Sequence, residues 1–172
     1  MSKLNIKIGD ITKETTDAIV NAANTSLLGG GGVDGAIHRA AGRGLLEECR
    51  TLNGCKTGEA KITKGYHLPS KYVIHTVGPI YRGGNNNESE LLKNAYENSL
   101  KVAVENKIKT IAFPSISTGV YSYPLKEASE IAVKTILDFL NKDNSIEEVI
   151  MVCFDNNTYD YYQKALKKLE GK

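Results

Sequence analysis

The chain has 172 residues, of which 41% are hydrophobic and 24% charged, the length and composition of an ordinary single globular domain. Its 22 basic residues nearly balance its 20 acidic ones, so the net charge of +2 gives no general argument for binding nucleic acid or a membrane surface. Three cysteines without CxxC spacing argue against a disulfide framework and a structural zinc site. We therefore expect one domain over residues 1–172 that recognises any ligand locally.

The sequence shows no targeting signal. The N-terminal residues lack a charged segment followed by an apolar one, and no apolar run approaches the roughly 20 residues that span a bilayer. These patterns predict a cytoplasmic protein without membrane contact. The near-neutral charge and the lack of an evident interface stripe favour a monomer.

Short apolar runs predict six strands, at residues 4–8, 18–20, 58–66, 72–77, 110–113 and 149–154. In the first, Leu4, Ile6 and Ile8 alternate with polar residues, so one face is expected to be buried. The second contains no polar position and is expected to be buried on both faces. The turn between the third and fourth predicts a hairpin or an adjacent pair of strands.

Apolar residues at helical spacing predict five helices between and after these strands. They are expected at residues 36–41, 45–52, 88–107, 124–140 and 159–169. Asp34 has the character of an N-cap for the first helix. Pro124 is expected at the first helical position of the fourth, where its missing N–H costs little. This alternation is typical of α/β proteins with helices on both faces of a sheet.

Four consecutive glycines, Gly29 to Gly32, follow the second strand, and a second loop of small residues at 115–123 follows the fifth. Glycine amides can approach a ligand closely because no Cβ intervenes. In a parallel sheet such loops meet beyond the carboxyl ends of the strands. Together they predict a site where backbone amides and helix N-termini enclose a diphosphate that joins two sugars. Asn24 and Asp34 flank the glycines and are candidates to hold or attack a hydroxyl-rich group beside the phosphates.

Several of these polar residues also have a purely structural interpretation. Asp34 by itself is more often a helix cap than a catalyst. His38, four residues later on the same helix face, fits a structural hydrogen bond better than a catalytic role. His75 lies in an apolar strand and is expected to be a satisfied core histidine. The tyrosines and lysines of the last helix fit packing and a solvated surface.

Six segments in collinear order resemble a macrodomain of the MacroD type over nearly the whole chain. They are Gly9-Asp-Ile-Thr12, Asn21-Ala-Ala-Asn24, the stretch from Leu27 to Gly35, Ala36-Ile-His-Arg39, His75-Thr-Val-Gly-Pro79 and Pro114-Ser-Ile-Ser-Thr-Gly-Val-Tyr121. The resemblance implies a three-layer α/β/α macrodomain fold with a mixed, mostly parallel central sheet. It also implies that the domain binds ADP-ribose.

The resemblance assigns roles to individual residues. Asp10 would accept a hydrogen bond from the adenine amino group, Asn24 would hold the distal ribose hydroxyls, and Asp34 would position or activate a water. Asn24 and Asp34 are thus the expected catalytic pair, without a metal or cofactor. The residues expected to contact ADP-ribose are Asp10, Ile11, Ala23, Asn24, Gly31, Gly32, Val33, Asp34, Ser117, Thr118, Gly119, Val120, Tyr121 and Phe154.

The implied activity is hydrolysis. The substrates would be proteins that carry mono-ADP-ribose on acidic side chains and O-acetyl-ADP-ribose, with ADP-ribosylated nucleic-acid ends as a further candidate. The alternative is a non-catalytic reader that only binds ADP-ribose or ADP-ribosylated proteins. The joint presence of Asn24 and Asp34 favours the hydrolase, because such readers tend to lack the pair.

Overall fold

Six strands form one mixed sheet in the order β1-β6-β5-β2-β4-β3 in the computed structural model, which describes residues 3–170. The strands are β1 (Lys3–Ile8), β2 (Ala18–Ala22), β3 (Ala60–Lys64), β4 (Tyr72–Thr76), β5 (Thr110–Phe113) and β6 (Glu148–Cys153). Neighbouring strands are parallel except β3 and β4, which pair antiparallel. The prediction of a mixed, mostly parallel sheet is confirmed, as is the adjacent pair around the turn that follows β3.

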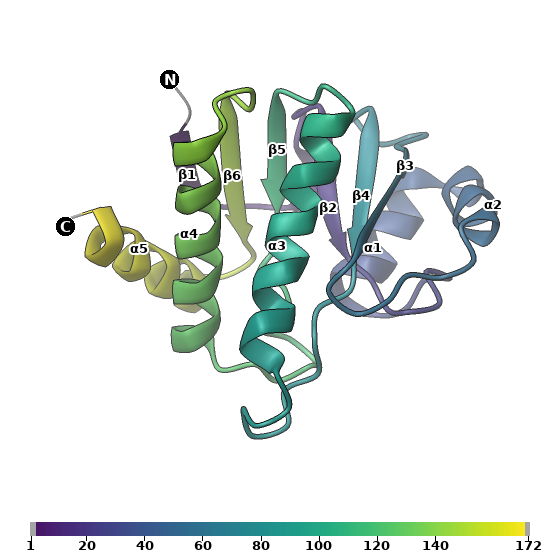
Figure 1. Ribbon diagram of the computed structural model, residues 1–172. Coiled ribbons are helices and arrows are strands. Elements are labelled where there is room, and N and C mark those ends of the chain that lie inside the picture. Colours follow the sequence, from purple (N-terminus) through teal and green to yellow (C-terminus); the bar gives the residue numbers. More distant parts are fainter. Residues whose placement is uncertain (1–2, 171–172) are drawn as a thin grey trace.

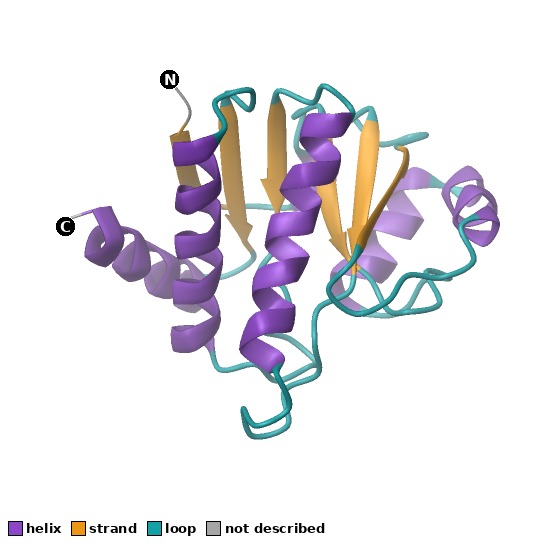
Figure 2. Ribbon diagram, viewed as in Figure 1, coloured by secondary structure: helices purple, strands orange, loops and turns teal. Residues whose placement is uncertain are grey.

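Helices cover both faces of this sheet (Figure 1, Figure 2). They are α1 (Gly32–Ala41), α2 (Arg43–Thr51), α3 (Glu88–Glu105), α4 (Leu125–Lys142) and α5 (Asn156–Glu170), and a 3₁₀ turn, η1 (Ile11–Lys13), follows β1. The helices α3, α4 and α5 share one buried cluster with the sheet, which includes Tyr96 and Tyr162. The helices α1 and α2 share the other, which includes Ile37 and Leu45. The predicted three-layer α/β/α fold is confirmed.

Burial differs between the centre and the edge of the sheet. Ala18, Ile19 and Val20 of β2 are all buried, which confirms that this strand is covered on both faces. In β1, Leu4 is buried, whereas Ile8 is 45% exposed. The predicted buried face therefore holds at Leu4, is only half-buried at Ile6 and is wrong at Ile8, the last residue of this edge strand.

The predicted roles of Asp34 and Pro124 at helix N-termini are both wrong. Gly31, not Asp34, is the N-cap of α1, so Asp34 lies inside the first turn of the helix. Pro124 is the N-cap of α4 rather than its first helical residue. The first helix begins earlier than predicted because two of its first four residues, Gly32 and Gly35, are glycines, which leave no trace in an apolar pattern.

The parallel strands direct four connections to one edge of the sheet, the lower edge in Figure 1. These are Gly9 to Ile11 after β1, the glycine loop after β2, the loop from Pro114 to Tyr123 after β5, and Phe154 after β6. Loops that are far apart in sequence thus meet beyond the carboxyl ends of the strands, where ligands bind in open α/β sheets.

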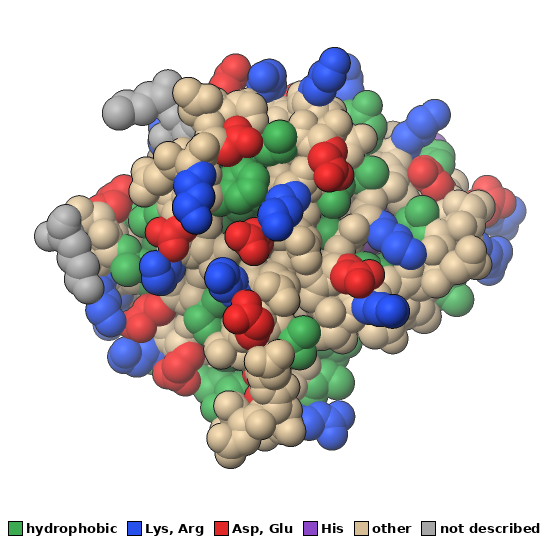
Figure 3. All heavy atoms as spheres, in the orientation of Figure 1, with side chains coloured by type: hydrophobic (Ala, Val, Ile, Leu, Met, Phe, Trp, Pro, Cys, Tyr) green, Lys and Arg blue, Asp and Glu red, His purple; other side chains and the backbone are tan. Residues whose placement is uncertain are grey.

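The outer helical layer presents an ordinary solvated surface. Basic and acidic side chains are interspersed over the α3 and α4 face (Figure 3). Two pairs on α4 lie one turn apart, Lys126 with Glu130 at 3.2 Å and Lys134 with Asp138 at 2.9 Å. Exposed pairs of this kind contribute little to stability. Among residues 3–170, no helix combines the length and apolar character needed to cross a bilayer.

Candidate functional site

A cleft of about 660 Å³ opens at the carboxyl edge of the sheet, within the usual size range of small-molecule sites. Every residue predicted to contact ligand lines it: Asp10, Ile11, Ala23, Asn24, Gly31, Gly32, Val33, Asp34, Ser117, Thr118, Gly119, Val120, Tyr121 and Phe154. The cleft is also lined by Gly9, Gly30, Ser115 and Ile116, which lie in segments that the sequence already indicated, and by Ala22, Ala36, Gly78, Pro114 and Val152, which were not predicted. Most of these are small or apolar neighbours of predicted residues, and adjacency is the only sequence signal that indicates them.

The glycine loop enters α1 with open backbone donors. The first amides of an α-helix have no intrahelical partner, and Gly31, the N-cap, has no side chain that could bond them. Gly32 has a φ of +58°, a left-handed conformation that glycine adopts without strain. The α1 N-terminus therefore presents free N–H groups and the positive end of the helix dipole to the cleft.

Gly35 sets how closely α1 packs on this loop. A Cβ at this position would lie 2.4 Å from the carbonyl oxygen of Gly30 and 3.0 Å from the Nη1 atom of Arg39. The Gly30 carbonyl belongs to the backbone and cannot move aside as the end of a flexible side chain can. The close approach of helix and loop therefore requires glycine at position 35.

Asn24 and Asp34 meet around Gly30. A Cβ at Gly30 would lie 3.2 Å from Asp34 Oδ2 and 3.4 Å from Asn24 Nδ2, so the two side chains border the same small space. Asn24 also shapes the loop: its Oδ1 accepts from the Leu27 amide at 3.1 Å, and its Nδ2 donates to the Gly29 carbonyl at 3.0 Å. Because an amide nitrogen carries two protons, one remains for a ligand.

Asp34 is 5% exposed, and its carboxylate therefore needs donors. Asn21 on β2 donates from Nδ2 to Asp34 Oδ1 at 2.8 Å. The first turn of α1, where Asp34 lies, also favours negative charge. One carboxylate oxygen is thus held from the sheet, while Oδ2, on the Gly30 side, is left for a water or ligand. Sequence reasoning did not single out Asn21, although a polar residue that continues an apolar strand was the available signal.

His75 on β4 holds Asn21 from the other side. Asn21 Nδ2 lies 3.2 Å from His75 Nδ1, and His75 Nε2 lies 3.0 Å from Thr63 Oγ1. Burial, reinforced by nearby His38, lowers the pKa of His75 to about 3, so the ring is neutral. A neutral ring that accepts at Nδ1 carries its proton at Nε2 and donates it to Thr63. The prediction of a satisfied core histidine is confirmed.

His38 approaches Asp34 without bonding to it. Its Nε2 lies 3.5 Å from Asp34 Oδ1, and this buried atom has no hydrogen-bond partner among the described residues. The structural hydrogen bond predicted for His38 is therefore wrong at Nε2. Asp34 Oδ1 accepts instead from Asn21, at 2.8 Å.

The second loop is held in a fixed shape. Ser117 has a φ of +67°, which is uncommon for a residue with a side chain. It is anchored by two bonds: its Oγ donates to the Pro79 carbonyl at 2.7 Å, and its carbonyl accepts from the Tyr123 amide at 2.9 Å. No hydrogen bond within residues 3–170 uses the amides of Gly119, Val120 and Tyr121. The loop therefore offers unpaired donors on a segment that lines the cleft.

Asp10, which also lines the cleft, caps η1. Its Oδ1 accepts from the Thr12 hydroxyl at 2.7 Å and from the Thr12 amide at 2.9 Å, and these bonds hold the pKa of the Asp10 carboxyl below its usual value. The second carboxylate oxygen is left for a donor on a ligand. Phe154 and Val120, at 77% and 89% exposure, are apolar residues on the rim.

Nucleophilic sulfur chemistry has no support in the cleft. The three cysteines are buried and unpaired. Burial raises the pKa of Cys49 to about 11 and that of Cys153 to about 12, so both remain thiols rather than reactive thiolates. Within the described residues, no three His, Cys, Asp or Glu side chains are grouped so that they could hold a metal ion.

Fold and site together define an α/β protein with a ligand cleft built from two loops at the carboxyl edge of its sheet. The chain belongs to the Macro domain family, whose model matches residues 20–132. This confirms the resemblance to macrodomains. A Macro domain-containing protein of Chlorobaculum tepidum is 64% identical, with 91% of each chain covered. An O-acetyl-ADP-ribose deacetylase of Citrobacter koseri is 53% identical over 96% of each chain.

Two further comparisons concern a longer protein and a solved structure. The ADP-ribose glycohydrolase MACROD2 of Xenopus laevis is 55% identical over 99% of this chain, which spans only 41% of that protein's length. A mutant of the Oceanobacillus iheyensis macrodomain, solved with ADPR, superposes with a TM-score of 0.95 at 50% identity, covering 98% of this chain and 94% of that one.

The close approach of α1 to the glycine loop leads to a stability prediction. Gly35→Ala should lower the melting temperature by roughly 3–10 °C, because overpacking of this kind costs about 1–3 kcal/mol. Gly31→Ala is the matched control: a Cβ there meets nothing within 4 Å and the backbone is extended, with φ at −93°. Differential scanning calorimetry of both variants checks the prediction, and equal melting temperatures would contradict the proposed contact.

Proposed function

We propose that this macrodomain binds ADP-ribose in the cleft and hydrolyses acyl esters of its distal ribose. The observation that carries the proposal is the approach of Asn24 and Asp34 to the same glycine, Gly30, on the wall of a cleft that Asp10 also lines. The deacetylase and glycohydrolase names of two relatives, and the ADPR in a structural neighbour, support the same ligand and reaction class.

The arrangement of donors and acceptors supports one direction of binding. The free oxygen of Asp10 suits the adenine amino group. The open amides of the α1 N-terminus and of the 119–121 segment suit the diphosphate between the two sugars. The distal ribose then lies beside Asn24 and Asp34. No lysine is needed for the phosphates, and none of the described residues that line the cleft is a lysine.

The proposed chemistry is attack of water on an ester carbonyl. The water oxygen bonds to the acyl carbon, the bond from that carbon to the ribose oxygen breaks, and the ribose oxygen leaves with a proton. Asp34 Oδ2 orients the water and takes up part of its proton, while Asn24 Nδ2 holds a ribose hydroxyl. Positioning of this kind suffices for a reaction with a good leaving group.

One mechanism serves both proposed substrates, since mono-ADP-ribose on a Glu or Asp side chain and O-acetyl-ADP-ribose are both acyl esters of a ribose hydroxyl. Residues 1–172 act in this proposal as one domain.

The competing function is a reader that binds ADP-ribose without turnover. The open carboxylate oxygen of Asp34 favours the hydrolase over the reader, because binding of ribose hydroxyls alone does not need a buried charge.

The Asp34→Asn variant tests the hydrolase. The amide keeps the size of the side chain and an oxygen that can accept from Asn21, but it loses the charge. Release of ADP-ribose from a glutamate-modified protein should fall by about 100-fold or more, while the affinity for ADP-ribose measured by calorimetry stays within about threefold. Wild-type protein that binds but releases nothing would make the reader the correct interpretation.

The position of the ligand can be tested by filling the cleft. Gly31→Glu places a side chain in open space at the α1 N-terminus, where the backbone is compatible with any residue. The carboxylate competes there with the diphosphate, so the affinity for ADP-ribose should fall by about 100-fold with little change in melting temperature. An unchanged dissociation constant would show that the ligand does not pass this point.

A further inference from the structure

A chain of hydroxyl groups connects the second loop to helices of the outer layer. Tyr162 on α5 and Tyr96 on α3 are both fully buried. The Tyr162 hydroxyl lies 2.8 Å from Ser115 Oγ and 3.4 Å from the Tyr96 hydroxyl. On the loop itself, Thr118 Oγ1 donates to Ser115 Oγ at 2.7 Å. Two helices of the outer layer therefore reach the loop through side-chain oxygens.

The order of donors along this chain follows from its ends. The Ile116 amide donates to the Tyr96 hydroxyl at 3.0 Å, and that hydroxyl lies 3.4 Å from the Pro114 carbonyl, which can only accept. With Thr118 donating to Ser115, every hydroxyl proton is used if Ser115 donates to Tyr162, Tyr162 to Tyr96, and Tyr96 to Pro114. Burial raises the pKa of Tyr162 to about 12 and that of Tyr96 well above its usual value, so both remain protonated.

The loop needs such support because its backbone is not in a relaxed state. Ser117 and Ser122 both have positive φ, near +67° and +63°. Conformations of this kind persist only where the surroundings hold them. Ser117 is held by Pro79 from one side, and the hydroxyl chain holds the preceding residues, Ser115 and Ile116, from the other.

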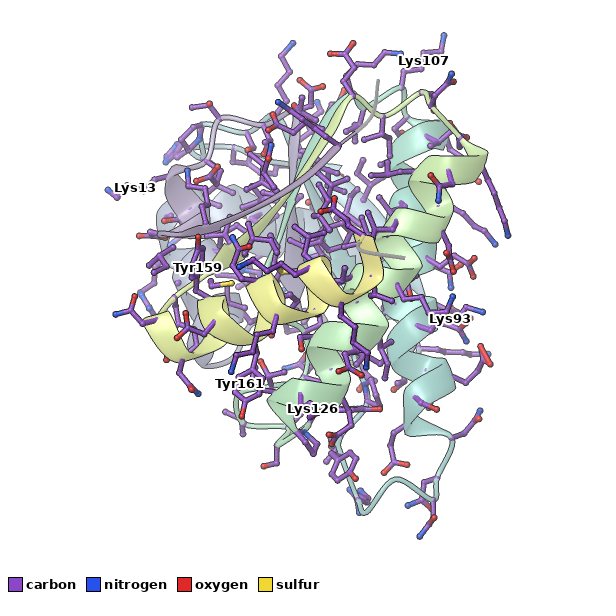
Figure 4. All side chains as sticks on the ribbon, turned by 90° about the vertical axis from the view of Figure 1, so that its left-hand side faces the viewer. Lys13, Lys93, Lys107, Lys126, Tyr159 and Tyr161 are labelled. Carbon is purple, nitrogen blue, oxygen red and sulfur yellow. The ribbon has the colours of Figure 1, made fainter. Side chains whose placement is uncertain are left out.

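We infer that Tyr162 is a positioning residue for diphosphate binding, which acts through Ser115 and Thr118 without touching the ligand. Tyr162 is not part of the cleft lining, whereas Ser115 and Thr118 are. The helix that carries it, α5, is the last in the described part of the chain and packs across α4 (Figure 4). The inference rests on the proposed binding of ADP-ribose and adds to it a residue that preorganises the loop.

The Tyr162→Phe variant isolates the hydroxyl, because it keeps the ring that packs in the core. Loss of one ordering hydrogen bond should weaken ADP-ribose binding roughly three- to tenfold. Binding of adenosine, which has no phosphate, should change less than twofold when followed by chemical-shift titration. For the hydrolysis reaction, KM should rise by a similar factor while kcat changes less than twofold, because the loop binds the diphosphate equally before and during the chemical step.

Tyr159→Phe is the matched control on the same helix. The Tyr159 hydroxyl accepts from Gln163 Nε2 at 2.9 Å and makes no hydrogen bond to the second loop among the described residues (Tyr159 is labelled in Figure 4). This variant should bind both ADP-ribose and adenosine as the wild type does. An equal loss in both tyrosine variants, or an equal loss of adenosine and ADP-ribose binding in Tyr162→Phe, would overturn the inference.

A second substitution, on the loop, interrupts the same chain of hydroxyl groups. Ser115→Ala should weaken ADP-ribose binding as Tyr162→Phe does, and the double variant should be no weaker than the weaker single one, because both remove the same connection. If Tyr162→Phe does not fold, unchanged ADP-ribose affinity in Ser115→Ala overturns the inference. If the wild-type protein binds no ADP-ribose, the proposed function is contradicted. If the wild type binds ADP-ribose but the losses of affinity in the two single variants add fully in the double variant, only the role of Tyr162 is contradicted.

Discussion

A charged carboxylate in a protein interior has to be surrounded by donors, and the geometry of this site follows from how Asp34 meets that condition. Asn21 reaches it from β2, and the N-terminal turn of α1 adds a favourable dipole. Asn21 in turn depends on His75, which is too deeply buried to take a second proton near neutral pH. The permanent acceptor at His75 Nδ1 keeps both protons of the Asn21 amide directed, one toward the histidine and one toward the carboxylate.

The two loops of the cleft are supported by opposite faces of the sheet. The glycine loop is shaped by the contact between Gly30 and Gly35, on the α1 side. The second loop is shaped by Tyr96 and Tyr162, on the α3 and α5 side. Each of the two loops that form the cleft is therefore held by a helical layer that packs on the sheet through a different hydrophobic cluster. A change that shifts one layer against the other alters the width of the cleft without touching any residue that lines it.

Much of this arrangement could be predicted from the sequence, because burial and glycine content leave local patterns. The wholly apolar run at β2 predicted a strand covered on both faces, and the two small-residue loops indicated the edge of the sheet where the cleft lies. The N-cap of α1 could not be predicted, since glycine residues open this helix and Asp34 has cap character by type alone. The roles of Asn21 and Tyr162 depend on partners far away in sequence. A stripe of apolar spacing predicts that a tyrosine is buried, but it does not indicate which hydroxyl its oxygen will meet.

The distribution of the cysteines has a practical consequence for following the unfolding of this protein. Cys49 and Cys55 belong to the buried cluster under α1 and α2, whereas Cys153 belongs to the cluster under α3, α4 and α5. Since all three thiols are buried, a small alkylating reagent can reach them only when the surrounding layer opens. The rate at which each thiol is alkylated, resolved by peptide mass spectrometry, thus reports the opening of one helical layer independently of the other, without any introduced label.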